Sequence, residues 1–472
     1  MEKAIELSSD ASRREFWRRW VRLLVTIAAQ NIIVYGVNLL DNIMIGKLGA
    51  AAELAISGVF IVNQIQFLLQ SICGSISDGT VVICSRYWGE GDTDKIKRAG
   101  ATSMQFGLIV SGVMMLAAIF FPTQVLGLLT DKPHVIAEGE KYLFIVAFTY
   151  MFFAATQVLL GILRSVETAF IGFINSCAAL VVNLVLNYIL IFGHFGAPAM
   201  GIRGAAIATL VSRVVEFVIV AVYIAFFDKK LKLKLSDFIK TDREISKKFF
   251  KVSLPVVFSG ASWGIAMSLQ TAILGRLTDP VISANSIAST VFQIMSVFIY
   301  GAATASSVMI GKTIGEARTM TAEMNEEDAF SALKTEIKHR VSRMQLIYIA
   351  MGAVTGLAIF LSRGFIISLY DISAETKELA MQFMAVLSVT VVGTAYQMTC
   401  LTGIVRGGGD TNFVFYNDII FMWGIVLPCS FIAAFVLKLS PVLIFIVLKS
   451  DQIIKCLVAV VKVNRYRWIK KF

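Results

Sequence analysis

Twelve apolar stretches, separated by short polar or charged segments, dominate the chain and decide what it can fold into. A helix crosses the hydrocarbon core of a bilayer with about 20 mostly apolar residues, and most of these stretches reach that length. They are too long for the strands of a membrane barrel and do not alternate between polar and apolar residues. Hydrophobic residues make up 57% of the sequence, more than the roughly half that is typical of a soluble domain. The sequence therefore predicts an all-α membrane protein.

Basic residues indicate on which side of the membrane each loop lies. With the N-terminus in the cytoplasm, most of the 43 Lys and Arg residues fall in cytoplasmic segments, as the positive-inside rule requires. An even number of spans then places the C-terminus in the cytoplasm as well. The longest such loop, Asp228 to Lys251, is basic, and we expect it to contact anionic lipid headgroups. The net charge of +11 is therefore not a sign of nucleic-acid binding.

The twelve transmembrane helices are predicted over residues 20–46, 53–84, 97–121, 135–163, 169–192, 204–227, 249–276, 281–311, 337–361, 377–404, 412–435 and 441–462.

The N-terminal segment does not read as a cleavable signal peptide, because it stays polar and charged up to Arg22 and the first apolar run is too long. Residues 12–22 are predicted to form a basic interfacial helix with Phe16, Trp17 and Trp20 facing lipid.

The chain repeats itself at an offset of about half its length. The two halves follow each other in the same orientation because each has six helices. Parallel repeats of this kind place a transporter's substrate site between them. The predicted segments are a basic N-terminal segment (1–22), an N-lobe with helices 1–6 (23–227), a cytoplasmic linker (228–248), a C-lobe with helices 7–12 (249–462) and a basic tail (463–472). The repeated motifs are Gly46-Lys47-Leu48 and Gly275-Arg276-Leu277, Gly89-Glu90 and Gly315-Glu316, and Leu163-Arg164-Ser165 and Val405-Arg406-Gly407.

A few polar residues interrupt the apolar stretches of the first half. A charged side chain at the bilayer centre costs about 2.5–3.5 kcal/mol on insertion scales. The presence of Asp41 in an apolar stretch therefore calls for a structural or functional explanation. Asn183 and Asn187 are four residues apart and share one helix face, and Thr209 adds a hydroxyl. One carboxylate with amide and hydroxyl oxygens suits Na⁺, and a carboxylate in apolar surroundings also suits H⁺. The alternative is that Asp41 only accepts hydrogen bonds between helices and the asparagines pair locally.

Other polar residues are candidates for the lining of a substrate cavity. Asn38 and Asn42 flank Asp41, and Asp78 lies in the cytoplasmic half of helix 2, where it lines the cavity or reaches the inner surface. Gln270 matches Asp41 by the repeat, so the second half has no acid at that place. Trp263 completes this set.

The remaining charges within the predicted helices have simpler explanations. Arg213 and Glu216 are expected to pair, as are Asp451 and Lys455, because residues three or four apart are neighbours on a helix. Asp418 is expected to reach the inner surface along its helix.

The pattern does not indicate an enzyme or a cofactor. His134, His194 and His339 are not spaced as metal ligands, and no phosphate-binding glycine loop precedes a Lys-Ser/Thr pair. The six cysteines stand singly in apolar runs, which is typical of buried hydrophobic side chains. No metal is expected beyond Na⁺ at Asp41, and the energy for transport must then come from an ion gradient.

Five motifs follow one another along the chain: Asp41 to Gly49, Tyr87 to Asp92, Asn183 to Gly193, Gly204 to Thr209 and Arg406 to Thr411. By their order and spacing, they resemble the multidrug and toxic compound extrusion (MATE) family over nearly the whole chain. The resemblance implies export of organic, cationic or amphipathic compounds by alternating access, driven by entry of Na⁺ or H⁺. It also implies an ion site at Asp41, Asn183, Asn187 and Thr209; Asn187 stands where some members have an acid, and Thr26 where some have a proline. At the place of a second-half glutamate that some members carry, this chain has Trp263.

Two other functions remain as alternatives. A lipid-linked oligosaccharide flippase of the same superfamily needs a strongly cationic cavity, but intramembrane Arg and Lys are few and mostly have acidic partners. A non-transporting receptor or membrane enzyme does not explain the two-fold repeat. We expect a monomer in the bacterial plasma (inner) membrane, with the lipid bilayer and small-molecule substrates as partners and no nucleic acid.

Overall fold

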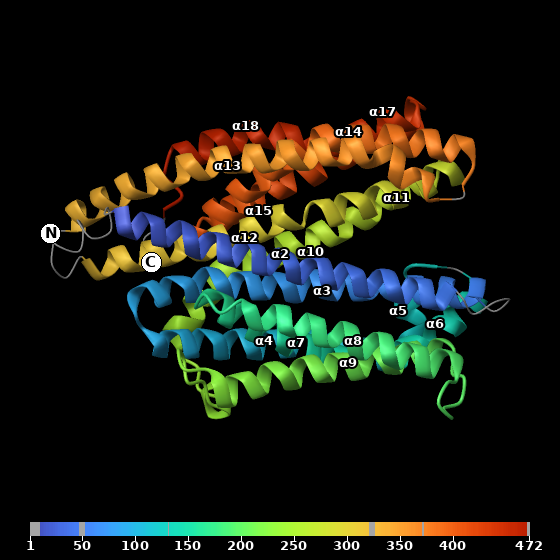
Figure 1. Ribbon diagram of the computed structural model, residues 1–472, viewed down its shortest axis with the longest axis horizontal. Helices are drawn as coiled ribbons and strands as arrows, with labels where there is room; N and C mark the ends of the chain where they lie inside the picture. Colours follow the sequence, from blue (N-terminus) through green and yellow to red (C-terminus); the bar gives the residue numbers. More distant parts are fainter. Residues whose placement is uncertain (1–9, 47–51, 131, 321–325, 371, 470–472) are drawn as a thin grey trace. The chain divides into compact units, whose positions relative to one another are not determined.

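The computed structural model describes residues 10–46, 52–130, 132–320, 326–370 and 372–469, and every regular element in them is helical. Within these ranges the side chains of 10–11, 38–43, 45–46, 52–56, 235, 279, 320 and 326–330 are not described. Figure 1 shows the elements in chain order. The α-helices are α2 (Asp10–Gly46), α3 (Ala52–Glu90), α4 (Thr93–Phe120), α5 (Pro122–Gly127), α6 (Pro133–Val146), α7 (Thr149–Ser165), α8 (Phe170–Phe192), α9 (Ile202–Val222), α10 (Arg243–Gly275), α11 (Asp279–Met295), α12 (Val297–Met320), α13 (Glu326–Ser368), α14 (Ala374–Met398), α15 (Thr411–Ile419), α16 (Leu427–Phe431), α17 (Pro441–Lys449) and α18 (Asp451–Asn464).

Ten helices of the described part are long and apolar enough to cross a membrane, and α6 with α7, bent by 50°, make an eleventh. The predicted twelfth span corresponds to α17 and α18. These helices have nine and fourteen residues and meet at Ser450, so neither reaches the length of a span alone. The predicted all-helical membrane architecture is confirmed.

Two compact units divide the chain. The first-half unit comprises the described residues of 29–84 and 93–250, and the second-half unit those of 1–28, 85–92 and 251–472. Helices α2, α3 and α10 therefore each contribute residues to both units.

Within the first-half unit, α8 and α9 lie side by side (Figure 1). Their close approach depends on Gly204 of α9, since a Cβ there would lie 2.6 Å from the carbonyl carbon of Leu190 on α8. The linker belongs to the same unit: Arg98 of α4 forms an ion pair with Asp242 at 3.4 Å. Backbone N–H groups of Ile245 and Glu244 donate to Asp242, and they hold the pKa of its carboxyl below its usual value.

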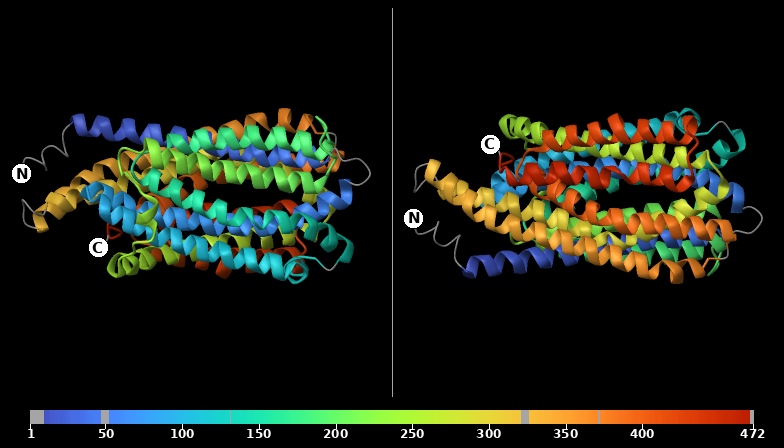
Figure 2. Two further views of the ribbon diagram at one scale, coloured as in Figure 1. Left: turned by 90° about the horizontal axis from the view of Figure 1, so that it is seen from below. Right: turned by 90° about the horizontal axis from the view of Figure 1, so that it is seen from above.

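Within the second-half unit, α13 is one continuous helix (amber in Figure 2) that packs against α14. Gly352 of α13 permits this contact, because a Cβ there would lie 2.8 Å from the Cα of Val392. Phe383 of α14 and Phe445 of α17 stack at 4.2 Å between ring centroids. The core of this unit is therefore a set of closely packed helices with aromatic contacts between them.

Wider, π-helical turns interrupt two helices of the second-half unit. One is η4 (Thr399–Val405), which continues α14. The others are η5 (Ile420–Val426) and η6 (Ile432–Val436), which flank α16 and its Pro428. Such turns are frequent at functional sites, and η5 and η6 follow each other on the eleventh predicted span. A π-helical turn also ends α9, at η2 (Tyr223–Phe227), and a 3₁₀ turn, η3 (Leu235–Phe238), lies in the linker.

The prediction that Phe16 and Trp20 face lipid is wrong. They lie on the continuous helix α2 with exposures of 4% and 3%. The indole N–H of Trp20 donates to Ser306 Oγ at 2.9 Å, and the guanidinium of Arg340 lies over the Phe16 ring at 4.4 Å. The start of α2 is thus buried against α12 and α13 within the second-half unit.

Candidate functional site

Two buried asparagines lie next to each other on one helix of the first-half unit. Asn183 and Asn187 on α8 are 3% and 1% exposed, and Asn187 Nδ2 donates to Asn183 Oδ1 at 3.0 Å. The predicted shared helix face is therefore confirmed, and so is local pairing of the two amides. Thr209, on the neighbouring helix α9, donates to the carbonyl of Ala205 at 3.0 Å. The lone pairs of its hydroxyl remain available as acceptors.

Three of the predicted site residues lie outside the described side chains. Asp41, Asn38 and Asn42 belong to the helical backbone of α2. Their side chains, and hence the geometry of the predicted cation site around Asp41, are not among the described parts of the structure.

A small cavity of about 10 Å³ lies next to Thr209, a volume that corresponds to a single water molecule. The buried Tyr150 hydroxyl on its wall makes no hydrogen bond with any described group. The sequence pattern missed the glutamines on α3 that line it, because an isolated Gln in an apolar helix carries no spacing signal. The lining residues are Gln66, Leu69, Gln70, Thr149, Tyr150, Phe153, Thr209 and Arg213.

The predicted ion pair between Arg213 and Glu216 is confirmed. The guanidinium Nη1 lies 2.7 Å from Glu216 Oε2, and the Arg213 guanidinium also lies over the Phe153 ring at 5.0 Å. Arg213 lines the small cavity. Because Glu216 pairs with it, the positive charge at that wall is neutralised.

Asp78 on α3 is partly buried and interacts electrostatically with Arg164 of α7. Arg164 Nη2 also lies 3.5 Å from Gln30 Oε1 on α2. Gly172 of α8 makes room for Gln30, since a Cβ there would lie 2.7 Å from Gln30 Oε1. Asp78 is thus part of a polar group that joins helices of the first-half unit.

In the second-half unit, Gln270 of α10 is buried and faces a cation. Lys449 Nζ donates to Gln270 Oε1 at 3.3 Å, and Gln270 Nε2 donates to Met422 Sδ at 3.3 Å. The position that matches Asp41 by the repeat therefore has a lysine beside it. Trp263, on the same helix, is 45% exposed.

Asp418, which is expected to reach the inner surface along its helix, forms an ion pair with a lysine of another helix. Its carboxylate lies 3.1 Å from Lys455 Nζ and accepts a hydrogen bond from Ser259 at 2.5 Å. Lys455 also pairs with Asp451 at 3.5 Å, as the four-residue spacing predicted. Asp418 comes from a different helix, 37 residues from Lys455, so no local spacing indicates its place in this triad.

Gln452 extends the triad, and the sequence pattern missed it. Its Nε2 donates to Asp451 at 3.0 Å, while its Oε1 accepts from Gln397 at 2.9 Å and Thr394 at 3.1 Å. The charges of this triad and the groups bonded to them are therefore supplied by α10, α14, α15 and α18.

In the part of the chain that the structure describes, no three His, Cys, Asp or Glu side chains are grouped as metal ligands.

Comparison with known proteins agrees with this arrangement. The MatE family model matches residues 26–189 and 331–456. The probable multidrug resistance protein YoeA of Bacillus subtilis is 25% identical over 448 residues, which cover 92% of this chain and 90% of YoeA. The probable multidrug resistance protein NorM of Agrobacterium fabrum is 26% identical over 288 residues, 60% of each chain.

Solved structures show the same fold. A crystal structure of a MATE protein in complex with MaL6 aligns with a TM-score of 0.81 over 95% of each chain at 20% identity. A transporter of the MOP superfamily from Pyrococcus furiosus aligns with a TM-score of 0.81 over 96% of each chain, also at 20% identity. The family match covers both halves of the polytopic helical chain, and the chain belongs to the multidrug and toxic compound extrusion (MatE) family of efflux transporters.

Proposed function

We propose that the chain exports small organic molecules by alternating access and takes the energy from inward movement of H⁺ or Na⁺. The observation that carries the proposal is the buried pair Asn183–Asn187, beside the helix that bears Thr209. Amide and hydroxyl oxygens are ligands for a small hard cation, but they carry no charge. A carboxylate must therefore supply the charge that an entering cation neutralises.

We assign that carboxylate to Asp41 on α2. Two buried amides carry no charge for a cation to neutralise, whereas an ionised carboxylate in apolar surroundings is costly until it binds a cation. A ligand shifts a conformational equilibrium only through different affinities for the two states. Moving the equilibrium from 1:99 to 99:1 takes about 5.5 kcal/mol of such difference. Cation binding at Asp41 supplies part of this difference and favours one orientation of the transporter.

The proposal includes an inner-membrane location with cytoplasmic termini, a monomeric transporter, and cationic or amphipathic substrates. The coupling ion is the one cofactor, and nucleic acid is not a partner.

Everted membrane vesicles that contain the protein test this function. A fluorescent organic substrate is added to the medium, which faces the cytoplasmic side of the everted membrane, and a pH gradient or a Na⁺ gradient is imposed separately. We expect one gradient to drive transport and its collapse to stop transport, relative to vesicles without the protein. Transport that continues at the same rate without either gradient would refute ion coupling.

A further inference from the structure

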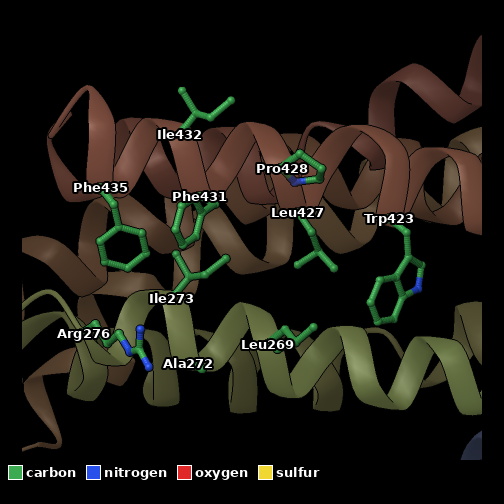
Figure 3. A pocket seen from close by; sticks show the side chains of 10 residues that line it. All are labelled: Leu269, Ala272, Ile273, Arg276, Trp423, Leu427, Pro428, Phe431, Ile432 and Phe435. Carbon is green, nitrogen blue, oxygen red and sulfur yellow. The ribbon is translucent and has the colours of Figure 1, made fainter.

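An apolar pocket of about 500 Å³ lies within the second-half unit, between α10 and the helical segment from η5 to η6 (Figure 3). Its walls come from helices of one unit, so the pocket does not depend on how the units are arranged. Ten side chains line it: Leu269, Ala272, Ile273, Arg276, Trp423, Leu427, Pro428, Phe431, Ile432 and Phe435.

The volume and lining suit a drug-sized aromatic molecule. Ligand pockets for such molecules are about 300–1,000 Å³ and mostly apolar. Trp423, Phe431 and Phe435 offer ring faces and edges for aromatic contacts. The indole N–H of Trp423 donates to Ser262 Oγ of α10 at 2.6 Å, which fixes the Trp423 ring. One wall is therefore an ordered aromatic surface.

Arg276 is the one charged residue among the ten, and it marks one end of the pocket. Figure 3 shows its side chain at the same end as Phe435, with Trp423 at the opposite end. An arginine guanidinium pairs with a carboxylate or sulfonate through parallel hydrogen bonds. A ligand with an anionic group at one end and an aromatic body matches both ends of the pocket.

The position of Arg276 at a helix end makes its positive charge important for attracting an anionic ligand. Arg276 follows Gly275, the last residue of α10, and the carbonyl groups at the C-terminus of a helix carry a partial negative charge. Without the guanidinium, this end of the pocket repels anions. The selectivity for an anion therefore depends on a single side chain.

We propose that this pocket binds aromatic amphiphiles with one anionic group, as substrates of the exporter. The inference rests on the proposed function and selects amphipathic compounds of negative charge for this site. A two-chain phospholipid also has an anionic head and an apolar body, but it is larger than the drug-sized molecules that fit a pocket of this volume.

The test is equilibrium binding to the purified full-length protein in nanodiscs of zwitterionic lipid. The probes are 2-naphthalenesulfonate and a naphthyltrimethylammonium ion, which share the ring and differ in charge. We expect the wild-type protein to prefer the sulfonate and Arg276→Gln to weaken sulfonate binding about tenfold, as expected for a hydrogen bond to a charged group. Arg276→Lys should retain most of the affinity, because it keeps the charge. Preference of the wild-type protein for the ammonium probe, or equal sulfonate affinity in Arg276→Gln, would overturn the proposal.

Arg203→Gln is the matched control, because Arg203 is exposed on α9 and does not line the pocket. We expect it to bind both probes as the wild-type protein does. In a second set of nanodiscs, part of the zwitterionic lipid is replaced by phosphatidylglycerol. Loss of sulfonate binding there, dependent on Arg276, would identify a lipid site and overturn the assignment to substrate. These binding results refute only the ligand class, whereas wild-type efflux without an ion gradient refutes the proposed function.

Discussion

Gly89 of α3 and Gly315 of α12 contact each other through their backbones: a Cβ on Gly315 would lie 2.9 Å from the Cα of Gly89, and one on Gly89 would lie 2.8 Å from the backbone nitrogen of Glu316. Both belong to the second-half unit, and they occupy equivalent places in the internal repeat. Glu90, next to Gly89, forms an ion pair with Arg318 at 2.9 Å. The repeated Gly-Glu motif thus allows two helix ends to touch.

Gly315→Ala should therefore destabilise the protein by about 1–3 kcal/mol, the usual cost of forcing extra volume into a packed contact. Thermal unfolding of the purified protein measures this loss. Gly74→Ala on α3 is the control, because a Cβ there meets nothing within 4 Å and alanine favours a helix by about 0.5–1 kcal/mol over glycine. An unchanged melting temperature in Gly315→Ala would contradict the close contact.

Lys455→Met should destabilise the protein by about 3–5 kcal/mol, because it leaves a buried carboxylate without the ammonium group that neutralises it. The most affected group is Asp451, which is 1% exposed. Adding Asp451→Asn should recover much of the loss, since Asp418 remains 27% exposed. Lys248→Met, in an exposed pair with Glu244, should cost less than about 1 kcal/mol. Equal melting temperatures for the two lysine variants would argue against a buried triad.

Trp20→Phe should cost about 0.5–1.5 kcal/mol, because the ring stays buried but loses its hydrogen bond to Ser306. Chemical or thermal unfolding of the detergent-solubilised protein measures the difference. Trp17→Phe, at a partly exposed position on the same helix, serves as the comparison. If Trp20 faced lipid instead of protein, the two substitutions would have similar effects.

Asn187→Leu keeps a similar volume but leaves Asn183 Oδ1 without the amide donor it has in the native structure. We expect a loss of about 1–3 kcal/mol from the unsatisfied buried acceptor and weaker ion-driven efflux. Val185→Ala, on an exposed face of the same helix, should leave efflux at the wild-type rate. Wild-type efflux in Asn187→Leu, measured in gradient-loaded vesicles, would exclude the amide pair from the transport site.

Local spacing predicted part of these sites well. The pairs Arg213–Glu216 and Asp451–Lys455 follow from neighbouring turns of one helix, and both are present. Asp418 joins the second pair from another helix, and helix packing, which decides that, leaves no local pattern. The sequence predicts a lipid contact for Phe16, but lipid and protein interior are both apolar, so an apolar helix face does not indicate which of them covers it.

The substitution Asp41→Asn shows whether this carboxylate couples export to the ion gradient. The protein is reconstituted in proteoliposomes, and export of an organic substrate is followed under an imposed H⁺ or Na⁺ gradient. Because asparagine cannot change charge, we expect gradient-driven export to stop, while the melting temperature and substrate binding show that the variant is folded. Export at the wild-type rate, with the same dependence on the ion gradient, would contradict the assignment of the coupling carboxylate.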